Sequence, residues 1–185
     1  MDAAARGELV AVTYKPARIR AYRQPDRAQV ERLWIDINRE LAPEAMRDAF
    51  EHYIATALLD ELQNALTVFS PSKRNGLWVV EIDGPIVGCF GLEAQGPDVT
   101  ELRRMYLRAD HRGGGVAQQM LAFAEEQARA SGFARMILST AAIQKQAVRF
   151  YAKSGYRLLR SETAQAMSTK TVGNGLLRHY FEKRL

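Results

Sequence analysis

Three consecutive glycines, residues 113–115, stand between a strand-like segment (101–108) and an amphipathic helix that begins at Val116. Each glycine destabilises a helix by about 1 kcal/mol relative to alanine, so a gain elsewhere must offset that cost. Without side chains, the backbone can turn tightly and bring its N–H groups against a ligand. A helix start adds unpaired N–H groups and a partial positive charge. The segment therefore predicts a phosphate-binding loop, with a flexible link as the alternative.

The rest of the sequence alternates between strand and helix patterns. Asp83-Gly84 separates two apolar runs of the kind that form a β-hairpin. Asp26 is expected to cap a helix, with Gln29 in the capping-box position. Strands are expected over residues 18–22, 77–82, 86–93, 101–108, 135–140, 156–159 and 177–185. Helices are expected over residues 26–41, 43–66, 116–131 and 143–153, and a polar loop over 161–175. This order predicts an α/β sandwich with a mixed sheet, built as one domain over 18–185 behind a flexible arm over 1–17.

Charge and composition narrow the classes of function. The chain has a net charge of +5, but its 26 Lys and Arg residues are scattered and are not interleaved with aromatic residues, so no nucleic-acid partner is expected. A small phosphorylated ligand fits the positive charge at least as well. The single cysteine, Cys89, and three widely spaced histidines predict no metal site. No apolar run approaches the ~20 residues that cross a bilayer and the start lacks a secretory pattern, so we expect a cytoplasmic protein without a membrane partner.

The glycine loop is similar to a known signature. It is not a Walker A loop or a dinucleotide-binding loop, because neither the Lys-Ser/Thr pair nor the G-x-G-x-x-G spacing is present. The run "RGGGVA", residues 112–117, matches the Arg/Gln-x-x-Gly-x-Gly/Ala signature of the GNAT superfamily of acetyl-CoA-dependent N-acetyltransferases. "QKQAVRFYAKSGYRL", residues 144–158, resembles the second cofactor segment of that superfamily. The resemblance is close over residues 77–159 and has a weaker component toward the branch that acetylates cysteine conjugates and aspartate.

The resemblance implies a fold and a way to bind acetyl-CoA. The fold would be a three-layer α/β sandwich whose mixed central sheet has antiparallel N-terminal strands and helices on both faces. Pyrophosphate would be held by the backbone amides of Arg112, Gly113, Gly114, Gly115, Val116 and Ala117. The backbone of Met105, Tyr106 and Leu107 would pair with the pantetheine amides like an added strand, leaving the acetyl carbonyl near the Leu107 amide. Gln144 occupies the place of an asparagine that often contacts pantetheine.

Two side chains are candidates for acid–base catalysis. Glu101 lies eleven residues before Arg112, where the resemblance places a glutamate that acts as the base, here through water. The alternative for Glu101 is an ordinary strand end in solvent, and Glu93 is the reserve candidate for the base. Tyr151 lies four residues before Gly155, which matches the tyrosine that reaches the coenzyme sulfur and protonates the leaving thiolate. The alternative for Tyr151 is a core aromatic residue.

Arg103 and Arg104 are unusual in a strand that is expected to be largely buried, because a buried arginine needs an anionic partner. Period-two alternation places Glu101, Arg103 and Met105 on one face and Leu102, Arg104 and Tyr106 on the other. One interpretation is that either arginine binds a substrate carboxylate. The other is an internal ion pair with Glu81 or Glu93.

These features predict an enzyme that transfers acetyl from acetyl-CoA to the primary amine of a small molecule, such as an amino acid or a derivative. No Ser-His-Asp pattern or exposed reactive cysteine is evident, which favours direct attack by the amine in a ternary complex over an acyl-enzyme. Acetylation of protein N-termini or lysines is an alternative, and so is a module that senses acyl-CoA without turnover. The alternating C-terminal strand offers an edge for a homodimer.

Overall fold

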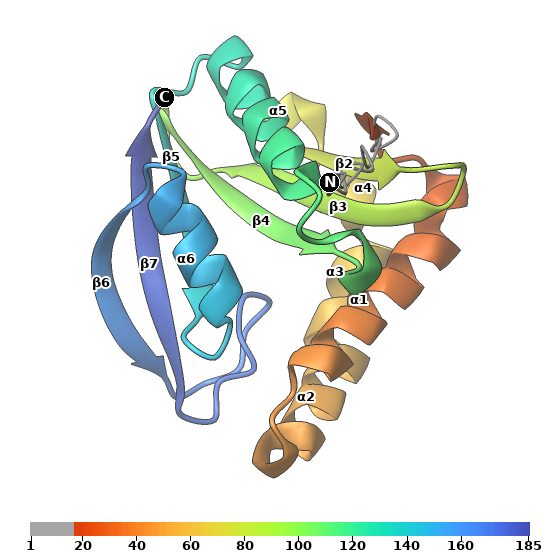
Figure 1. The fold of residues 1–185 in the computed structure, drawn as a ribbon, viewed down its shortest axis with the longest axis vertical. Coiled ribbons are helices and arrows are strands. Elements are labelled where there is room, and N and C mark those ends of the chain that lie inside the picture. Colours follow the sequence, from red (N-terminus) through yellow and green to blue (C-terminus); the bar gives the residue numbers. More distant parts are fainter. Residues whose placement is uncertain (1–16) are drawn as a thin grey trace, which may run out of the picture.

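The computed structural model describes residues 17–185, which form one sheet with helices on both faces (Figure 1). The arm expected over residues 1–17 lies, apart from Ala17, outside the described residues. The strands are β1 (Arg18–Ala21), β2 (Gly76–Glu81), β3 (Ile86–Ala94), β4 (Val99–Leu107), β5 (Arg135–Ala141), β6 (Arg157–Ala164) and β7 (Leu176–Arg184). The helices are α1 (Arg27–Leu41), α2 (Arg47–Tyr53), α3 (Leu59–Gln63), α4 (Ala65–Val68), α5 (Val116–Ala130) and α6 (Lys145–Lys153).

The seven strands are arranged in the order β1-β2-β3-β4-β5-β7-β6. β1 to β4 are antiparallel neighbours in chain order, and the turn between β2 and β3 contains Asp83 and Gly84 with positive φ angles of 56° and 106°. β4 and β5 are parallel, whereas β5, β7 and β6 are again antiparallel. The mixed sheet and its antiparallel N-terminal half are therefore confirmed.

The parallel pair at the centre of the sheet is short. Val99–Leu102 of β4 are in register with Arg135–Leu138 of β5, although β4 continues to Leu107 and β5 to Ala141. Figure 1 shows the two strands separating beyond the paired segment. The C-terminal halves of β4 and β5 therefore border an opening in the sheet. Open α/β sheets commonly bind ligands at the carboxyl ends of their parallel strands.

A β-bulge at Arg104 lies beside this opening. The β3–β4 register shifts by one residue here, and Arg104 has a positive φ of 53°. Arg103 and Arg104 consequently contact the same carboxylate, whereas Met105 packs on the α5–α6 side of the sheet and Tyr106 on the α1 side. The predicted alternation is therefore wrong beyond Arg103, because a period-two pattern does not reveal an inserted residue.

Each face of the sheet has its own hydrophobic core. On one face, helices α1 to α4 pack on β2 and β3, and Trp34, Leu58 and Val79 are fully buried there. On the other face, α5 and α6 pack on β3, β4 and β5, with Phe90 and Met120 fully buried. Each such side chain contributes about 1.5–3 kcal/mol of hydrophobic free energy. The two cores account for the three-layer arrangement that the resemblance implied.

The start of α1 differs from the prediction. Asp26 has helical backbone angles and ends a short 3₁₀ turn, where it accepts a hydrogen bond from the backbone N–H of Arg23 at 2.7 Å. Its carboxylate also binds Arg20 on β1 at 2.7 Å. Gln29 accepts a hydrogen bond from the backbone N–H of Ile86 at 3.1 Å. Both polar side chains therefore tie α1 to the sheet, and the predicted capping box is wrong.

The helix expected over residues 43–66 is divided into shorter pieces. A π-helical turn, Ile54–Leu58, connects α2 to α3, and Asn64 separates α3 from α4. A π-helical turn changes which side chains face the sheet and is frequent at functional sites. It immediately precedes α3, where the side chain of Glu61 is buried. The predicted loop over 161–175 is shorter than expected, because β6 extends to Ala164.

Candidate active site

The glycine loop connects β4 to the first turn of α5. Gly113 and Gly115 both have φ of 82°, and Gly115 is the N-cap residue of α5. A Cβ on either glycine would meet no heavy atom within 4 Å among residues 17–185, so the loop presents bare backbone to open space. Arg112 anchors the loop by donating from Nε to the carbonyl of Leu107 at 2.9 Å. The arrangement leaves the first N–H groups of α5 available to an anion.

A cavity of about 590 Å³ lies beside this loop and is referred to below as the glycine-loop cavity. Its wall comes from the end of α1, the end of β4, the loop, the start of α5 and one side of α6, and includes Glu40, Met105, Tyr106, Leu107, Arg112, Gly113, Ala117, Gln144, Lys145, Arg149 and Tyr151. Glu40 and Arg112 form an ion pair at 2.5 Å. Lys145 and Arg149 add two further positive charges. The cavity therefore suits an anionic ligand.

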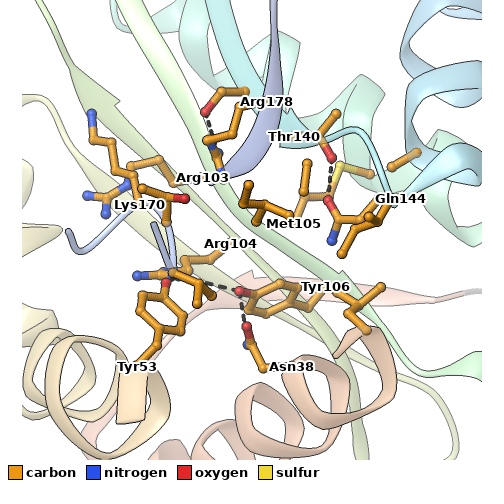
Figure 2. A pocket seen from close by; sticks show the side chains of 18 of the residues that line it. Asn38, Tyr53, Arg103, Arg104, Met105, Tyr106, Thr140, Gln144, Lys170 and Arg178 are labelled. Carbon is orange, nitrogen blue, oxygen red and sulfur yellow. Dashed lines mark hydrogen bonds between the residues drawn. The ribbon is translucent and has the colours of Figure 1, made fainter. Parts of the chain in front are cut away.

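A second cavity, of about 150 Å³, occupies the opening between β4 and β5 (Figure 2). It is referred to below as the Glu101 cavity, and its wall includes Asn38, Tyr53, Glu101, Arg103, Arg104, Ser139, Thr140, Lys170, Thr171 and Arg178. Seven residues line both cavities: Leu41, Met105, Tyr106, Ile143, Gln144, Ala147 and Tyr151. The two cavities therefore adjoin, and the β4 segment after the bulge forms part of their common wall.

Tyr151 lies on α6 at the junction of the two cavities. Its ring packs in the core against Tyr156 and Phe181, and its hydroxyl donates to the sulfur of Met105 at 3.5 Å. Burial raises the pKa of Tyr151, so the hydroxyl keeps its proton at neutral pH. A protonated hydroxyl at this place can serve as an acid. Tyr151 is thus a core aromatic residue that also lines both cavities, and its role as the acid stays a prediction.

Glu101 is buried, with 7% of the residue exposed, and it lines the smaller cavity. Its carboxylate forms an ion pair with Lys170, which reaches it from the loop between β6 and β7. The alternative interpretation of Glu101 as a strand end in solvent is therefore wrong. The reserve candidate, Glu93, binds Arg103 at 2.6 Å. Of the two glutamates, Glu101 lines the cavity between β4 and β5, and Glu93 does not.

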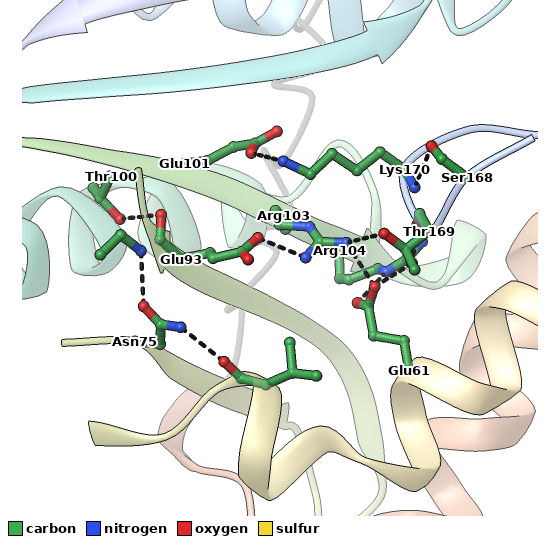
Figure 3. A network of polar contacts seen from close by, with 12 residues as sticks. Glu61, Asn75, Glu93, Thr100, Glu101, Arg103, Arg104, Ser168, Thr169 and Lys170 are labelled. Atoms are coloured by element: carbon green, nitrogen blue, oxygen red, sulfur yellow. Dashed lines mark hydrogen bonds and ion pairs between the residues drawn. The ribbon is translucent and has the colours of Figure 1, made fainter. Parts of the chain in front are cut away.

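Arg103 and Arg104 share the carboxylate of Glu61 (Figure 3). Arg103 contacts Glu61 at 2.6 Å, and Arg104 contacts it at 2.9 Å. The side chain of Glu61 is only 2% exposed, and those of the arginines 7% and 6%. The predicted ion pair between Arg103 and Glu93 is present as well. Glu81, the other predicted partner, instead pairs with Arg20 of β1. Contact of either arginine with a substrate carboxylate stays a prediction.

Arg104 is held by further contacts around the cavity. Nη1 donates to the hydroxyl of Tyr53 at 2.7 Å and to that of Tyr106 at 3.4 Å, and Nη2 donates to the carbonyl of Thr169. The hydroxyl of Tyr106 also accepts a hydrogen bond from Asn38 at 3.3 Å. These contacts fix Tyr106, which lines both cavities. The bulged strand is therefore held rigidly where the cavities meet.

Gln144 also lies where the cavities meet. It precedes α6, and its side-chain oxygen accepts a hydrogen bond from the hydroxyl of Thr140 on β5. The contact orients the amide, so that its N–H groups are free to serve as donors. Gln144 therefore lines the same cavity as Tyr151 and the end of β4, and its contact with a pantetheine chain stays a prediction.

Sequence reasoning missed Glu61, Lys170 and Arg178. Glu61 had a detectable signal, since it follows Ala57 by four residues and Leu58 by three on the apolar side of a helix. A carboxylate at such a position indicates a buried ion pair. Lys170 and Arg178 had no comparable signal, because the β6–β7 loop and β7 reach the site only through the order of strands in the sheet.

Comparison with known proteins agrees with this geometry. The model of the Acetyltransferase (GNAT) family matches residues 27–156, which include α1, the glycine loop, the β4–β5 opening and Tyr151. The chain belongs to the GNAT family. Within residues 17–185, no helix is long and apolar enough to cross a membrane, and no three or more His, Cys, Asp and Glu side chains are grouped to hold a metal ion.

Curated GNAT relatives match part of the chain. The uncharacterized N-acetyltransferase YjgM of Escherichia coli is 38% identical over 106 residues, which cover 56% of this chain and 61% of YjgM. N-acetyltransferase 8 of Rattus norvegicus is 26% identical over 113 residues, covering 58% of this chain and 51% of the rat protein. The matched part thus spans about half to three-fifths of these relatives.

Solved GNAT structures share the fold. The PaiA N-acetyltransferase of Thermoplasma acidophilum, solved in complex with coenzyme A, superposes with a TM-score of 0.71. The superposition covers 92% of this chain and 100% of that chain, at 16% sequence identity. At this identity the likeness establishes a common fold, which agrees with the mixed sheet and its central opening.

Proposed function

We propose that this GNAT protein transfers the acetyl group of acetyl-CoA to the primary amine of a small molecule, by direct attack within a ternary complex. The junction of the two cavities carries the proposal. Tyr151 and Met105 line both cavities, and Glu101 lies in the wall of the inner one. An acid and a base thus flank one connected space, which a transfer between two bound molecules requires.

The glycine-loop cavity fits the coenzyme. The backbone amides of residues 112–117 are proposed to hold its pyrophosphate, because a Cβ on Gly113 or Gly115 would point into open space. Lys145 and Arg149 add positive charge nearby. The backbone of residues 105–107 lies beyond the segment paired with β5, so one edge of this strand is available to the pantetheine amides. Gln144 supplies a further amide at the same place.

The chemistry follows from the two titratable groups. As the amine nitrogen forms its bond to the thioester carbonyl carbon, Glu101 is proposed to receive the proton that the nitrogen loses, through a water molecule. The backbone amide of Leu107 is proposed to stabilise the negative charge on the carbonyl oxygen. As the C–S bond breaks, Tyr151 gives its proton to the sulfur. Solvent then carries the proton from Glu101 back to Tyr151.

Direct attack is favoured because the only thiol in the sequence is not accessible. Cys89 is its single cysteine and is fully buried. Burial raises the pKa of the Cys89 thiol to about 12, and Trp34 donates a hydrogen bond to its sulfur at 3.1 Å. A thiol that stays protonated inside the core is a poor acetyl carrier.

The size of the Glu101 cavity favours a small acceptor over a protein. Its volume is about 150 Å³, and an engineered cavity of roughly that size in another protein binds benzene. The buried Glu101 also favours turnover over coenzyme sensing, because burying a carboxylate is costly and coenzyme binding does not need one at this place.

The test is the release of coenzyme A thiol from acetyl-CoA in the presence of separate panels of small amines, amino acids and peptides. We expect turnover with small amines and loss of turnover in Glu101→Gln. Preference for peptides would instead favour the protein acetyltransferase alternative. Tight acetyl-CoA binding with no turnover on any panel would contradict the proposal and favour a sensor.

A further inference from the structure

Arg178 is a buried arginine in the wall of the Glu101 cavity (Figure 2). It lies on β7 opposite Ala141 of β5, and 9% of the residue is exposed. Its Nη2 donates a hydrogen bond to the hydroxyl of Ser139 at 2.7 Å, which is an uncharged acceptor. Burial lowers the pKa of Arg178, as expected when a cation is taken out of water.

The other cations of this cavity are each bound to a carboxylate of the protein. Arg103 binds Glu61 and Glu93, Arg104 binds Glu61, and Lys170 binds Glu101. Four cations thus surround three carboxylates. Arg178 is the one of these four that forms no ion pair among residues 17–185, although the charge of Glu101, which Lys170 already binds, also acts on it.

The acidic side chain opposite Arg178 on the edge strand β6 does not neutralise its charge. Glu162 of β6 lies opposite Arg178 in the β6–β7 ladder, but its carboxylate binds Arg160 at 2.5 Å. Within the part of the chain that the structure describes, no ion pair joins Arg178 to a carboxylate. A buried charge is strongly unfavourable unless an opposite charge pairs with it. A ligand group with a negative charge beside Arg178 would therefore stabilise the site.

We propose that Arg178 binds the carboxylate of the acceptor, which makes the acceptor a small molecule with both a primary amine and a carboxylate. The inference rests on the proposed function and assigns a specificity to its acceptor site. An arginine presents a planar fork of N–H groups that matches a carboxylate, and the contacts of Arg178 with the hydroxyls of Ser139 and Tyr180 do not use all of its N–H groups. The cavity of about 150 Å³ suits a carboxylate better than a larger anion.

The opposite end of such an acceptor also has a place in the cavity. Glu101 already binds the ammonium group of Lys170, so its surroundings accept an ammonium ion. The amine of the acceptor takes the place of the ammonium group of Lys170, whose side chain is 38% exposed and can turn to solvent, and the carboxylate of the acceptor binds Arg178. An acceptor that arrives as an ammonium ion first loses one proton to solvent, and its second proton passes to Glu101 as the amine attacks. Arg103 and Arg104 shape the wall between them, since both are held by Glu61.

The test compares free α-, β- and γ-amino acids with their carboxamides, which keep the amine and lose the charge. Wild-type protein should prefer the amino acids. Arg178→Gln should lower kcat/KM for the preferred amino acid by about 10- to 100-fold, mainly through KM, because hydrogen bonds to charged groups are strong. The matching carboxamide should change by less than about threefold. Arg157→Gln, at an arginine whose side chain is 75% exposed on β6, should leave both unchanged.

The inference would be overturned if folded Arg178→Gln lost equal factors of kcat/KM for the amino acid and its carboxamide. It would also be overturned if the wild-type protein turned over both compounds equally well. Arg178→Lys keeps the charge without the fork and should give an intermediate loss, so it serves if Arg178→Gln does not fold. Absence of turnover with every amine would count against the proposed function. In that case, calorimetry measures the binding of amino acids to the complex of the protein with coenzyme A. Binding to wild type that is lost in Arg178→Gln would support the inference, and no binding to wild type would overturn it.

Discussion

The carboxylate of Glu61 accepts two hydrogen bonds from Arg104, from Nε at 2.9 Å and from Nη2 at 3.0 Å. The same carboxylate binds Arg103, so one buried anion on α3 holds both cations of the bulged strand. The bulge in turn places Met105 and Tyr106 in the common wall of the two cavities. The short helix α3, which lies outside the glycine-loop signature (112–117), thus helps to set the shape of the proposed transfer site.

Replacing Glu61 should therefore destabilise the whole protein. Glu61→Gln leaves Arg104 without a carboxylate partner inside the core, and breaking a buried pair in this way costs about 3–5 kcal/mol. Urea unfolding measures the change. The matched control is Glu51→Gln, which removes an exposed ion pair with Arg39 at 2.7 Å and should leave the stability close to that of wild type. Equal stability of Glu61→Gln and wild type would show that the network is not important for folding.

A second prediction concerns the binding of acetyl-CoA at the glycine loop. Gly115→Val should abolish the thermal stabilisation that acetyl-CoA gives, because the new side chain would extend into the space proposed for the pyrophosphate. In wild type this stabilisation should reach about 2.7 kcal/mol at a ligand concentration one hundred times the dissociation constant. Thermal melts with and without acetyl-CoA measure it.

Gly84→Val is the control for backbone strain. Gly84 has φ of 106° in the β2–β3 turn, and a Cβ there also points into open space. Both variants should lower the melting temperature without ligand, since valine rarely adopts such angles. Only Gly115→Val should lose the response to acetyl-CoA. A full response in Gly115→Val would place the pyrophosphate elsewhere.

Direct attack predicts that the cysteine is dispensable. Cys89→Ala should keep kcat within about threefold of wild type, because the thiol is buried in the core and its pKa is raised to about 12. The lost packing and the lost hydrogen bond from Trp34 should appear as lower stability, by roughly 1–3 kcal/mol. Steady-state kinetics and melting temperature measure the two effects. Complete loss of turnover in folded Cys89→Ala would reopen the acyl-enzyme route.

Local sequence patterns predicted the elements and the loop. The turn at Asp83-Gly84, the glycines before Val116 and the helical face that contains Tyr151 each depend on residues close together in the chain. Such signals predict a strand, a turn or a helix start without knowledge of the segments that pack against it in the fold. A cavity does lie beside the predicted glycine loop, whereas binding of the coenzyme there stays a prediction.

The acceptor side was less predictable, because its contacts join distant segments. Glu61 meets Arg103 across 42 positions of sequence, and Lys170 meets Glu101 across 69. The Arg104 bulge arises from how β4 pairs with β3, which a single strand does not encode. The sequence therefore drew attention to both arginines of β4. Among the three arginines that line the Glu101 cavity, however, the one that forms no ion pair with a carboxylate of residues 17–185 is Arg178.

The most direct test of catalysis is Tyr151→Phe. This change keeps the ring that packs on Tyr156 and Phe181 and removes only the hydroxyl near Met105. If the hydroxyl protonates the leaving thiolate, kcat should fall by roughly 10²- to 10⁴-fold, which corresponds to about 2.7–5.4 kcal/mol. Because burial raises the pKa of Tyr151, the hydroxyl stays protonated in the assay range, and the fall should be the same at pH 7 and pH 9.

The controls for Tyr151→Phe are coenzyme affinity and melting temperature. Both should stay close to wild type, because the loop and strand backbone are proposed to hold most of the coenzyme. Phe150→Leu, at the neighbouring aromatic residue of α6, tests whether disturbed packing alone lowers kcat. Wild-type turnover in Tyr151→Phe would remove the acid role and leave Tyr151 as a core residue. A large fall in kcat with unchanged folding and affinity, and no such fall in Phe150→Leu, is the result that the position of the hydroxyl at the cavity junction predicts.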